Sequence, residues 1–199
     1  MFEILYRITD KRDYLESLGE KSFDLGGDVL GFFALNVNGY HFGHYHNYPL
    51  KPDECDWEKI TNWLLLLTYV YKELNHSGYA LLDIVDSFNT WLEFKKNKDE
   101  VVINIIKAEK EEGDYSEIRL IPLDKFEYGD WYIQSVKLGK VHEELVKRQN
   151  EAIRLNDFRL ELSRKALQYL DEINEINPKL LKNENFEKLK KRLPYLMKK

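Results

Sequence analysis

The segment LGFFALNVNGYHFGHYH places two runs of apolar and aromatic residues on either side of Asn38-Gly39. Asparagine and glycine tolerate the positive φ angles of a type I′ turn, whose twist matches that of the flanking strands. The pattern predicts a β-hairpin over residues 29–46. Because a chain with such a hairpin cannot be purely helical, the other segments are interpreted around it.

Several further segments have the composition of β-strands. Residues 2–8 (FEILYRI) alternate between two faces, and YALLDIVDS predicts a short strand over 79–87. TWLEFKKNKDEVVINIIKAE predicts a second hairpin with Asn97 at the turn, since its second half is rich in β-branched residues. The segment YSEIRLIPL (115–123) predicts a further strand, which completes an antiparallel meander.

Apolar residues spaced three and four apart predict four helical segments. Asp56 is expected to cap a buried helix over 57–75, which Gly78 would end. Helical character is then expected from Leu123 onward. The other predicted segments are a helix or helix pair over 126–153, a helix over 157–176 and a short helix over 185–196.

Strands and helices do not alternate along the chain, so a doubly wound fold is excluded. We expect an α+β fold with an antiparallel sheet of five to seven strands, one buried helix and a helical C-terminal third. We expect residues 1–155 to form one α+β domain, with residues 156–199 as a helical extension packed on it. A length of 199 residues fits this organisation.

Charge is distributed unevenly. Residues 1–178 carry a net charge of −11 and residues 179–199 carry +6, for a total of −5. The acidic balance argues against a nucleic-acid partner. The basic tail is typical of a solvated terminal helix, because lysines suit the negative end of the helix dipole.

Features of the sequence also predict where the protein resides. The single cysteine, Cys55, excludes an intrachain disulfide framework and multi-cysteine metal sites. The N-terminus lacks the pattern of a signal peptide, and the longest apolar run, residues 63–67, is too short to span a membrane. We therefore expect a cytoplasmic protein that does not enter a membrane.

Histidines gather in the predicted hairpin. On a strand, His44 and His46 share a face, and two imidazoles at this spacing can bind one metal ion. His41, Asp53 and Cys55 are candidate additional ligands. Exposed histidines in an aromatic-rich hairpin are the simpler interpretation, since no third ligand stands at motif spacing. We expect no metal and no cofactor.

Carboxylates form the other candidate for chemistry. Asp83 and Asp86 lie near Glu93 if the predicted strands pair, and such a group could act in acid–base catalysis or hold a cation. Asp86-Ser87 is also typical of a turn. The chain contains none of the nucleophile, phosphate-binding or kinase motifs that would identify catalytic residues. Cys55 has no motif-level histidine, so we assign no catalytic residue.

A third candidate is a surface for another protein. Tyrosine and tryptophan are enriched at the energetic centres of protein interfaces. The predicted contact residues are Tyr40, Tyr45, Tyr48, Trp131 and Tyr132.

The order of elements resembles that of the immunity proteins that bacteria encode beside polymorphic toxins. The resemblance covers residues 29–154 and is carried by the Asn38-Gly39 hairpin, the helix entered by DWEKITNWLLLL and the strands TWLEF and VVINII. It implies an acidic, non-enzymatic protein that occludes a toxin encoded nearby. Two alternatives stay open: a small metal-dependent enzyme that uses the histidine hairpin, and a scaffold that forms homo-oligomers through its C-terminal helices.

Overall fold

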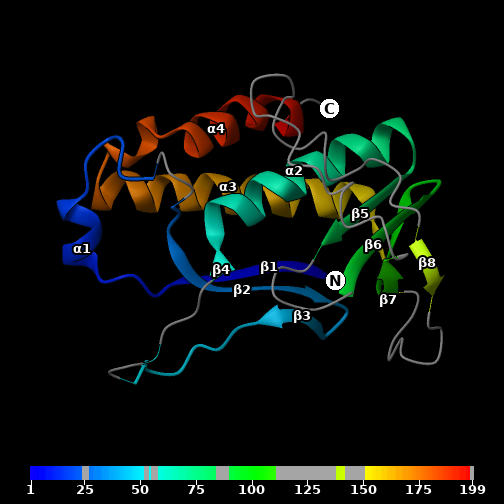
Figure 1. Ribbon diagram of the computed structural model, residues 1–199. Coiled ribbons are helices and arrows are strands. Elements are labelled where there is room, and N and C mark those ends of the chain that lie inside the picture. Colours follow the sequence, from blue (N-terminus) through cyan, green and yellow to red (C-terminus); the bar gives the residue numbers. More distant parts are fainter. Residues whose placement is uncertain are drawn as a thin grey trace. The chain divides into compact units, whose positions relative to one another are not determined.

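The chain forms two compact units, whose elements are labelled in Figure 1. The computed structural model describes residues 1–23, 27–51, 54, 58–83, 90–110, 138–141 and 151–197. The first unit consists of Met1–Thr68 and Asn156–Lys199, and the second consists of Tyr69–Leu155. The boundary expected at residue 155 is thus the end of the second unit, and the helices after it complete a unit with residues 1–68.

The first unit contains a four-stranded antiparallel sheet. Its strands are β1 (Phe2–Ile8), β2 (Leu30–Val37), β3 (Tyr40–His44) and β4 (Glu58–Lys59). The order is β1-β2-β3, and β4 also pairs with β2. Asn38 and Gly39 have φ angles of 52° and 87°, so the predicted hairpin and its type of turn are confirmed.

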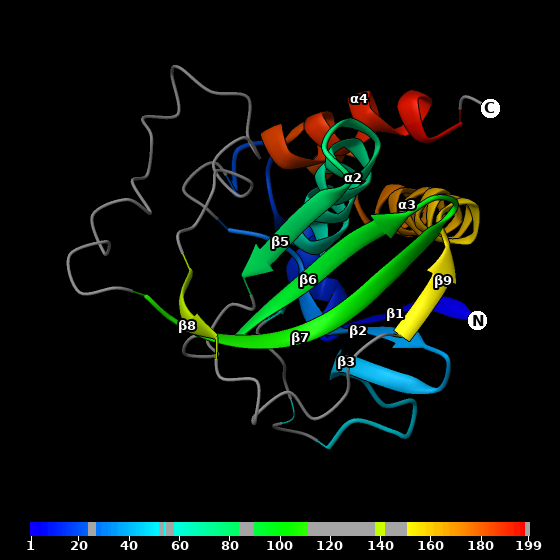
Figure 2. The same ribbon diagram turned by 90° about the vertical axis from the view of Figure 1, so that its right-hand side faces the viewer.

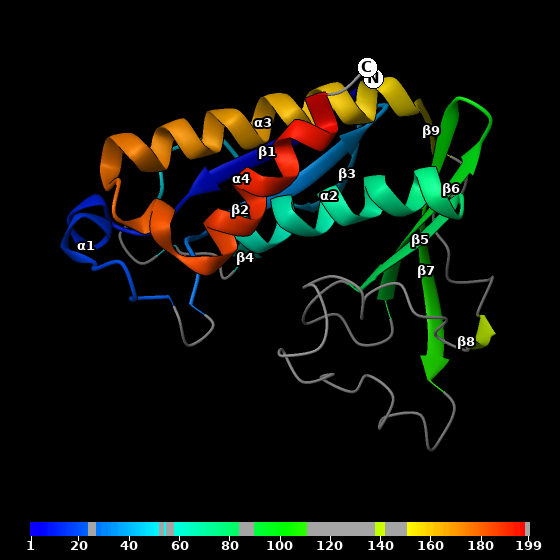
Figure 3. The ribbon, with the colours of Figure 1, turned by 90° about the horizontal axis from the view of Figure 1, so that it is seen from above.

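The helices of the first unit are α1 (Arg12–Ser17), the beginning of α2 (Ile60–His76), α3 (Leu155–Ile176), η4 (Leu180–Lys182) and α4 (Glu184–Met197). Of these, the beginning of α2, α3 and α4 lie on one side of the sheet in Figures 1 and 3. The helices predicted over 157–176 and 185–196 are therefore confirmed. Ring contacts connect β1, α3 and α4 through the pairs Phe2–Phe158, Tyr6–Tyr169 and Tyr169–Phe186, with centroids 5.1, 5.5 and 5.8 Å apart.

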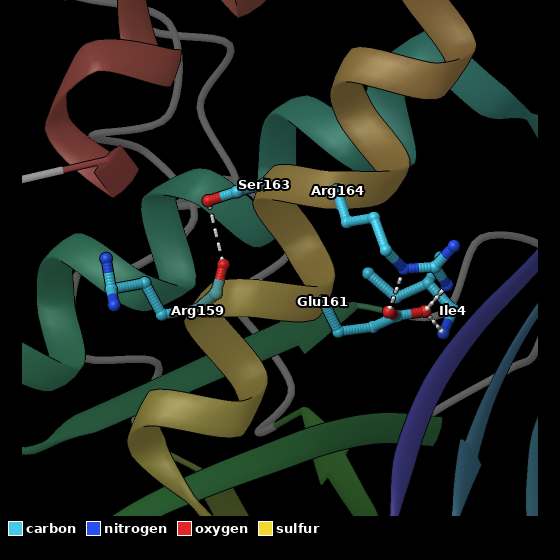
Figure 4. A network of polar contacts seen from close by, with 5 residues as sticks. All are labelled: Ile4, Arg159, Glu161, Ser163 and Arg164. Carbon is cyan, nitrogen blue, oxygen red and sulfur yellow. Dashed lines mark hydrogen bonds and ion pairs between the residues drawn. The ribbon is translucent and has the colours of Figure 1, made fainter.

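A side chain of α3 blocks the outer edge of β1 (Figure 4). Glu161 Oε1 accepts a hydrogen bond of 2.9 Å from the backbone N–H of Ile4. Arg164 donates two hydrogen bonds of 2.8 Å to the same carboxylate, while the neighbouring Ser163 hydroxyl donates to Arg159 O inside the helix. Since a free strand edge is a template for pairing with another chain, Glu161 protects this one.

The beginning of α2 is capped by a residue from far away in the sequence. Asp28 Oδ1 accepts hydrogen bonds from the backbone N–H groups of Val29 (2.7 Å) and Thr61 (3.2 Å), and Oδ2 accepts one from Asn62 (2.9 Å). The Asp28 carboxylate thus accepts hydrogen bonds from Thr61 and Asn62, whose N–H groups lie in the first turn of the helix and have no backbone partner within it. The helix begins at Ile60, three residues later than predicted, and the predicted cap Asp56 lies outside the described residues.

Burial of Asp28 makes stability depend on pH. Desolvation is the main cause that raises its pKa from 3.8 to about 6, against the opposing effect of its hydrogen bonds. The folded protein therefore binds this proton more tightly than the unfolded chain does, and its stability falls as the pH rises through 4 to 6. We expect the group to lower the free energy of unfolding by about 1 kcal/mol between pH 5 and pH 7.

Urea unfolding at the two pH values measures this change. The Asp28→Asn variant provides the comparison because amides do not titrate in this range. It lacks the contribution of residue 28 to the pH dependence of stability and retains the contributions of all other groups. An equal change in the wild type and the variant would contradict the prediction.

The second unit contains a five-stranded antiparallel sheet. Its strands are β5 (Tyr79–Asp83), β6 (Thr90–Asn97), β7 (Glu100–Lys110), β8 (Leu138–Val141) and β9 (Glu151–Arg154). The order is β5-β6-β7-β8, and β9 also pairs with β7. The predicted second hairpin is confirmed. Its two-residue turn consists of Lys98 (φ 56°) and Asp99, one residue after the expected Asn97.

The helical interpretation of residues 126–153 is wrong where the structure describes them. Residues 138–141 and 151–154 are strands. The apolar pair Ala152-Ile153 lies opposite Val102 and Val101 of β7. Residues 151–154 form a strand because they pair with β7, and the local sequence pattern does not indicate this pairing. The strand predicted over 115–123 lies outside the described residues. The α+β class with antiparallel strands is confirmed, and the strands are divided between two sheets rather than one.

The basic tail packs as part of the first unit. The buried residues of α4 lie at a helical spacing and are Phe186, Leu189, Leu193 and Leu196. Three lysines of the tail form ion pairs, Lys182 with Glu20, Lys188 with Glu184 and Lys190 with Glu187. This arrangement agrees with a solvated amphipathic helix.

Candidate functional site

A buried histidine follows the end of β3. His46 is 7% exposed, and its Nε2 lies 2.7 Å from Oε1 of Glu54. Its ring centroid lies 4.5 Å from that of Phe32. Its Nδ1 is also buried, and within the described part of the chain this atom has no hydrogen-bond partner. The imidazole is thus fixed by one carboxylate and by aromatic packing.

Tyr48 covers this histidine with an exposed ring. The rings of His46 and Tyr48 stack with centroids 3.8 Å apart and an interplanar angle of 9°. Tyr48 nevertheless remains 58% exposed. Arg7 Nη1 donates a hydrogen bond of 2.6 Å to the backbone O of Tyr48, which also holds the main chain at this point. Tyr48 is therefore an exposed aromatic side chain in a fixed position.

The backbone at Gly43 shapes the neighbouring surface. Gly43 has a φ of 105°, and a Cβ there would lie 2.4 Å from Phe33 O, so only glycine fits. Beyond this glycine, the ring of His44 lies 5.0 Å from Phe32 and 5.9 Å from His46. The rings of His44 and His46 therefore lie near one another, although β3 ends at His44 and His46 lies beyond the strand.

Glu54 holds the histidine from the following loop. Its Oε2 accepts a hydrogen bond of 3.0 Å from the backbone N–H of Lys51. This hydrogen bond first, and His46 second, lower the pKa of the Glu54 carboxyl. Sequence reasoning missed Glu54 and Arg7. The spacing of Glu54 from His46 has no motif, and Arg7 acts from β1.

The other predicted contact residues differ in exposure. Tyr40 and Tyr45 are half-buried, and the Tyr40 ring packs edge-on against Phe42 with centroids 4.8 Å apart. Trp131 and Tyr132 lie outside the described residues. We name the set Tyr40, His41, His44, His46 and Tyr48 the tyrosine–histidine surface. Of its two tyrosines, Tyr48 is the more exposed.

The tyrosine–histidine surface is not acidic. Residues 29–52 contain no Asp or Glu, although the chain has 35 of them. The segment does contain three histidines and Lys51. Aromatic and acidic residues are therefore not combined along this segment, and the Glu54 carboxylate that follows it contacts His46.

The predicted metal ligands do not assemble in the described residues. Across that part of the chain, no three or more His, Cys, Asp or Glu side chains gather in a way that could hold a metal ion. Asp53 and Cys55 lie outside it, and His41 is exposed on β3. Within the described residues, His44 and His46 therefore have no third side chain that could complete a metal site.

The predicted carboxylate group is only partly described. Glu93 of β6 is 7% exposed and is held by Asn104 Nδ2 at 2.9 Å, Lys95 Nζ at 2.9 Å and the Tyr79 hydroxyl at 3.2 Å. Burial first, and Glu93 second, raise the pKa of Tyr79 to about 12. Asp83 pairs with Trp91 at the end of β5, and Asp86 lies outside the described residues. The Glu93 group is a satisfied polar network on the sheet.

Comparisons with known proteins add no family. No protein-family model matches the chain, and neither the curated proteins nor the solved structures contain a match. None of the helices in the described part combines the length and apolar composition needed to cross a bilayer.

Proposed function

We propose that this chain is a non-enzymatic protein-binding module that contacts its partner through the tyrosine–histidine surface. The carrying observation is Tyr48, which is 58% exposed although it is stacked on a buried histidine and tied through its backbone to Arg7. A ring that is already fixed loses little conformational freedom on binding, and such tyrosines dominate interface energies.

The form of this function that the sequence resemblance implies is an immunity-type inhibitor. In that case the partner is a toxin encoded next to this chain, and binding occludes the toxin's active surface. The absence of a catalytic motif from the sequence supports a binding role over an enzymatic one.

Replacing Tyr48 with alanine is expected to weaken binding of the neighbouring gene product at least tenfold. The loss should appear mainly as faster dissociation, because buried anchors control the lifetime of a complex. Biolayer interferometry with the purified pair measures both rates. Tyr14→Ala is the matched control, since Tyr14 is 50% exposed on α1 in the same unit.

Equal affinities for the wild type and Tyr48→Ala would overturn the proposal that this surface binds the partner. Turnover of a small molecule by the pure protein, with no protein bound, would favour an enzyme. The alternative of a homo-oligomeric scaffold is tested separately by light scattering, since α3 exposes Leu160 (50%) and Leu167 (39%) seven residues apart.

A further inference from the structure

The outer edge of β3 carries backbone groups that face away from the sheet, and their direction follows from two hydrogen bonds. Asn38 N donates to Met1 O at 2.8 Å, and Thr9 N donates to Leu30 O at 3.0 Å. Even-numbered residues of β2 therefore direct their backbone polar groups toward β1. Because this direction alternates along a strand, the odd-numbered residues direct theirs toward β3.

The register of the hairpin then determines which backbone N–H and C=O groups of β3 point away from β2. Val37 lies opposite Tyr40, and Asn36 lies opposite His41. In an antiparallel pair, opposite residues either bond to one another or both point away. Tyr40 therefore bonds toward β2, whereas the N–H and C=O groups of His41 and Gly43 point outward. Both of these residues are exposed.

The two outer edges of this sheet differ in protection. Glu161 occupies the backbone N–H of Ile4 on β1. Among the described residues no strand pairs with the outer side of β3, which lies at the border of the sheet in Figure 2. β3 also lacks the lysines and prolines with which proteins block exposed edges. Tyr48, the proposed anchor, follows this strand by four residues.

The charge next to this edge defines the partner segment that fits it. Residues 29–52 contain no carboxylate and include three histidines and Lys51, whereas the rest of the chain is rich in Asp and Glu. An acidic segment is therefore repelled less by residues 29–52 than by the rest of the chain. We infer that the partner adds an extended, carboxylate-bearing segment to the outer edge of β3 as a further antiparallel strand, an inference that rests on the proposed function.

Synthetic peptides test this mode directly. The probes are two ten-residue peptides that alternate valine with glutamate or valine with lysine, labelled for fluorescence anisotropy. The glutamate peptide is expected to bind the wild-type protein at least tenfold more tightly than the lysine peptide. Strand addition uses every second amide of the peptide. N-methylation of one alternate set should therefore abolish binding, and methylation of the other set should leave it.

A pair of variants tests the same edge from the protein side. His41→Pro removes the outward N–H and places a ring where the added strand would lie, a position at which an edge strand tolerates proline. His41→Ala removes the same imidazole and keeps the N–H. We expect at least a tenfold loss of glutamate-peptide binding for His41→Pro relative to His41→Ala, with melting curves confirming that both fold.

The outcomes separate this inference from the proposed function. If Tyr48→Ala weakens binding of the neighbouring gene product and His41→Pro does not, strand addition is wrong. Binding through the tyrosine–histidine surface is then still supported. If neither variant weakens it, the proposed function is wrong. Equal binding of both N-methylated peptides, or preference for the lysine peptide, overturns strand addition by an acidic segment. The peptide result decides the matter on the wild-type protein even if His41→Pro does not fold.

Discussion

Replacement of Asp28 with alanine is expected to lower the free energy of unfolding at pH 7 by about 3 kcal/mol, because each buried polar group left unpaired costs about 1–3 kcal/mol. The carboxylate accepts the backbone N–H groups of Val29, Thr61 and Asn62. The variant removes this acceptor from the N–H groups of Thr61 and Asn62 in the first turn of α2 and from that of Val29. Removing the buried charge offsets part of the loss, since ionised Asp28 is itself desolvated.

Two comparisons make this expectation specific. Asp28→Asn keeps one oxygen acceptor and removes the charge. Its free energy of unfolding should therefore lie between those of the wild type and the alanine variant. Asp171→Ala removes a carboxylate from an exposed position of α3 and should change stability by less than about 0.5 kcal/mol. Urea denaturation at pH 7 measures all three. A loss below about 1 kcal/mol for Asp28→Ala would show that water or a neighbouring group replaces the cap.

The elements that sequence reasoning predicted correctly are those with a local signal. The Asn38-Gly39 turn needs only two residues with positive φ, and both have it. The helix α3 carries its apolar stripe within its own 22 residues. The second hairpin differs from its prediction by one turn residue, because a lysine adopts the left-handed conformation expected of asparagine. Local chemistry was sufficient in each of these cases.

The features that sequence reasoning missed depend on partners far apart in the chain. The cap of α2 joins Asp28 to residues more than thirty positions later, and this long-range acceptor replaces the expected local cap. β9 is a strand because it pairs with β7, about fifty residues earlier in the chain. The sequence around Ala152 and Ile153 alone therefore led to the prediction of a helix. The candidate site follows the same rule: the histidine cluster was visible, but the Arg7 contact that fixes Tyr48 depends on the packing of the sheet.

Replacement of Asn177 with alanine is expected to lower the free energy of unfolding by about 2 kcal/mol, since the carbonyls of Leu15 and Leu18 lose the donor that the buried Asn177 amide provides. Asn177 follows α3 and is 5% exposed. Its Nδ2 donates to Leu15 O (2.8 Å) and Leu18 O (3.0 Å) at the end of α1, and its Oδ1 accepts from Lys179 N at 3.1 Å. One amide thus joins the C-terminal ends of α1 and α3.

The aspartate variant distinguishes this role from simple packing. Asn177→Asp keeps the volume but replaces the donor by a carboxylate facing the carbonyls of α1, so it should destabilise more than alanine does. Asn174→Ala, on an exposed position of the same helix, should have little effect. Thermal unfolding measures the three variants, and hydrogen exchange should show faster exchange in α1 for the two Asn177 variants alone. If aspartate were tolerated as well as alanine, the carbonyls of α1 would not depend on the Asn177 donor.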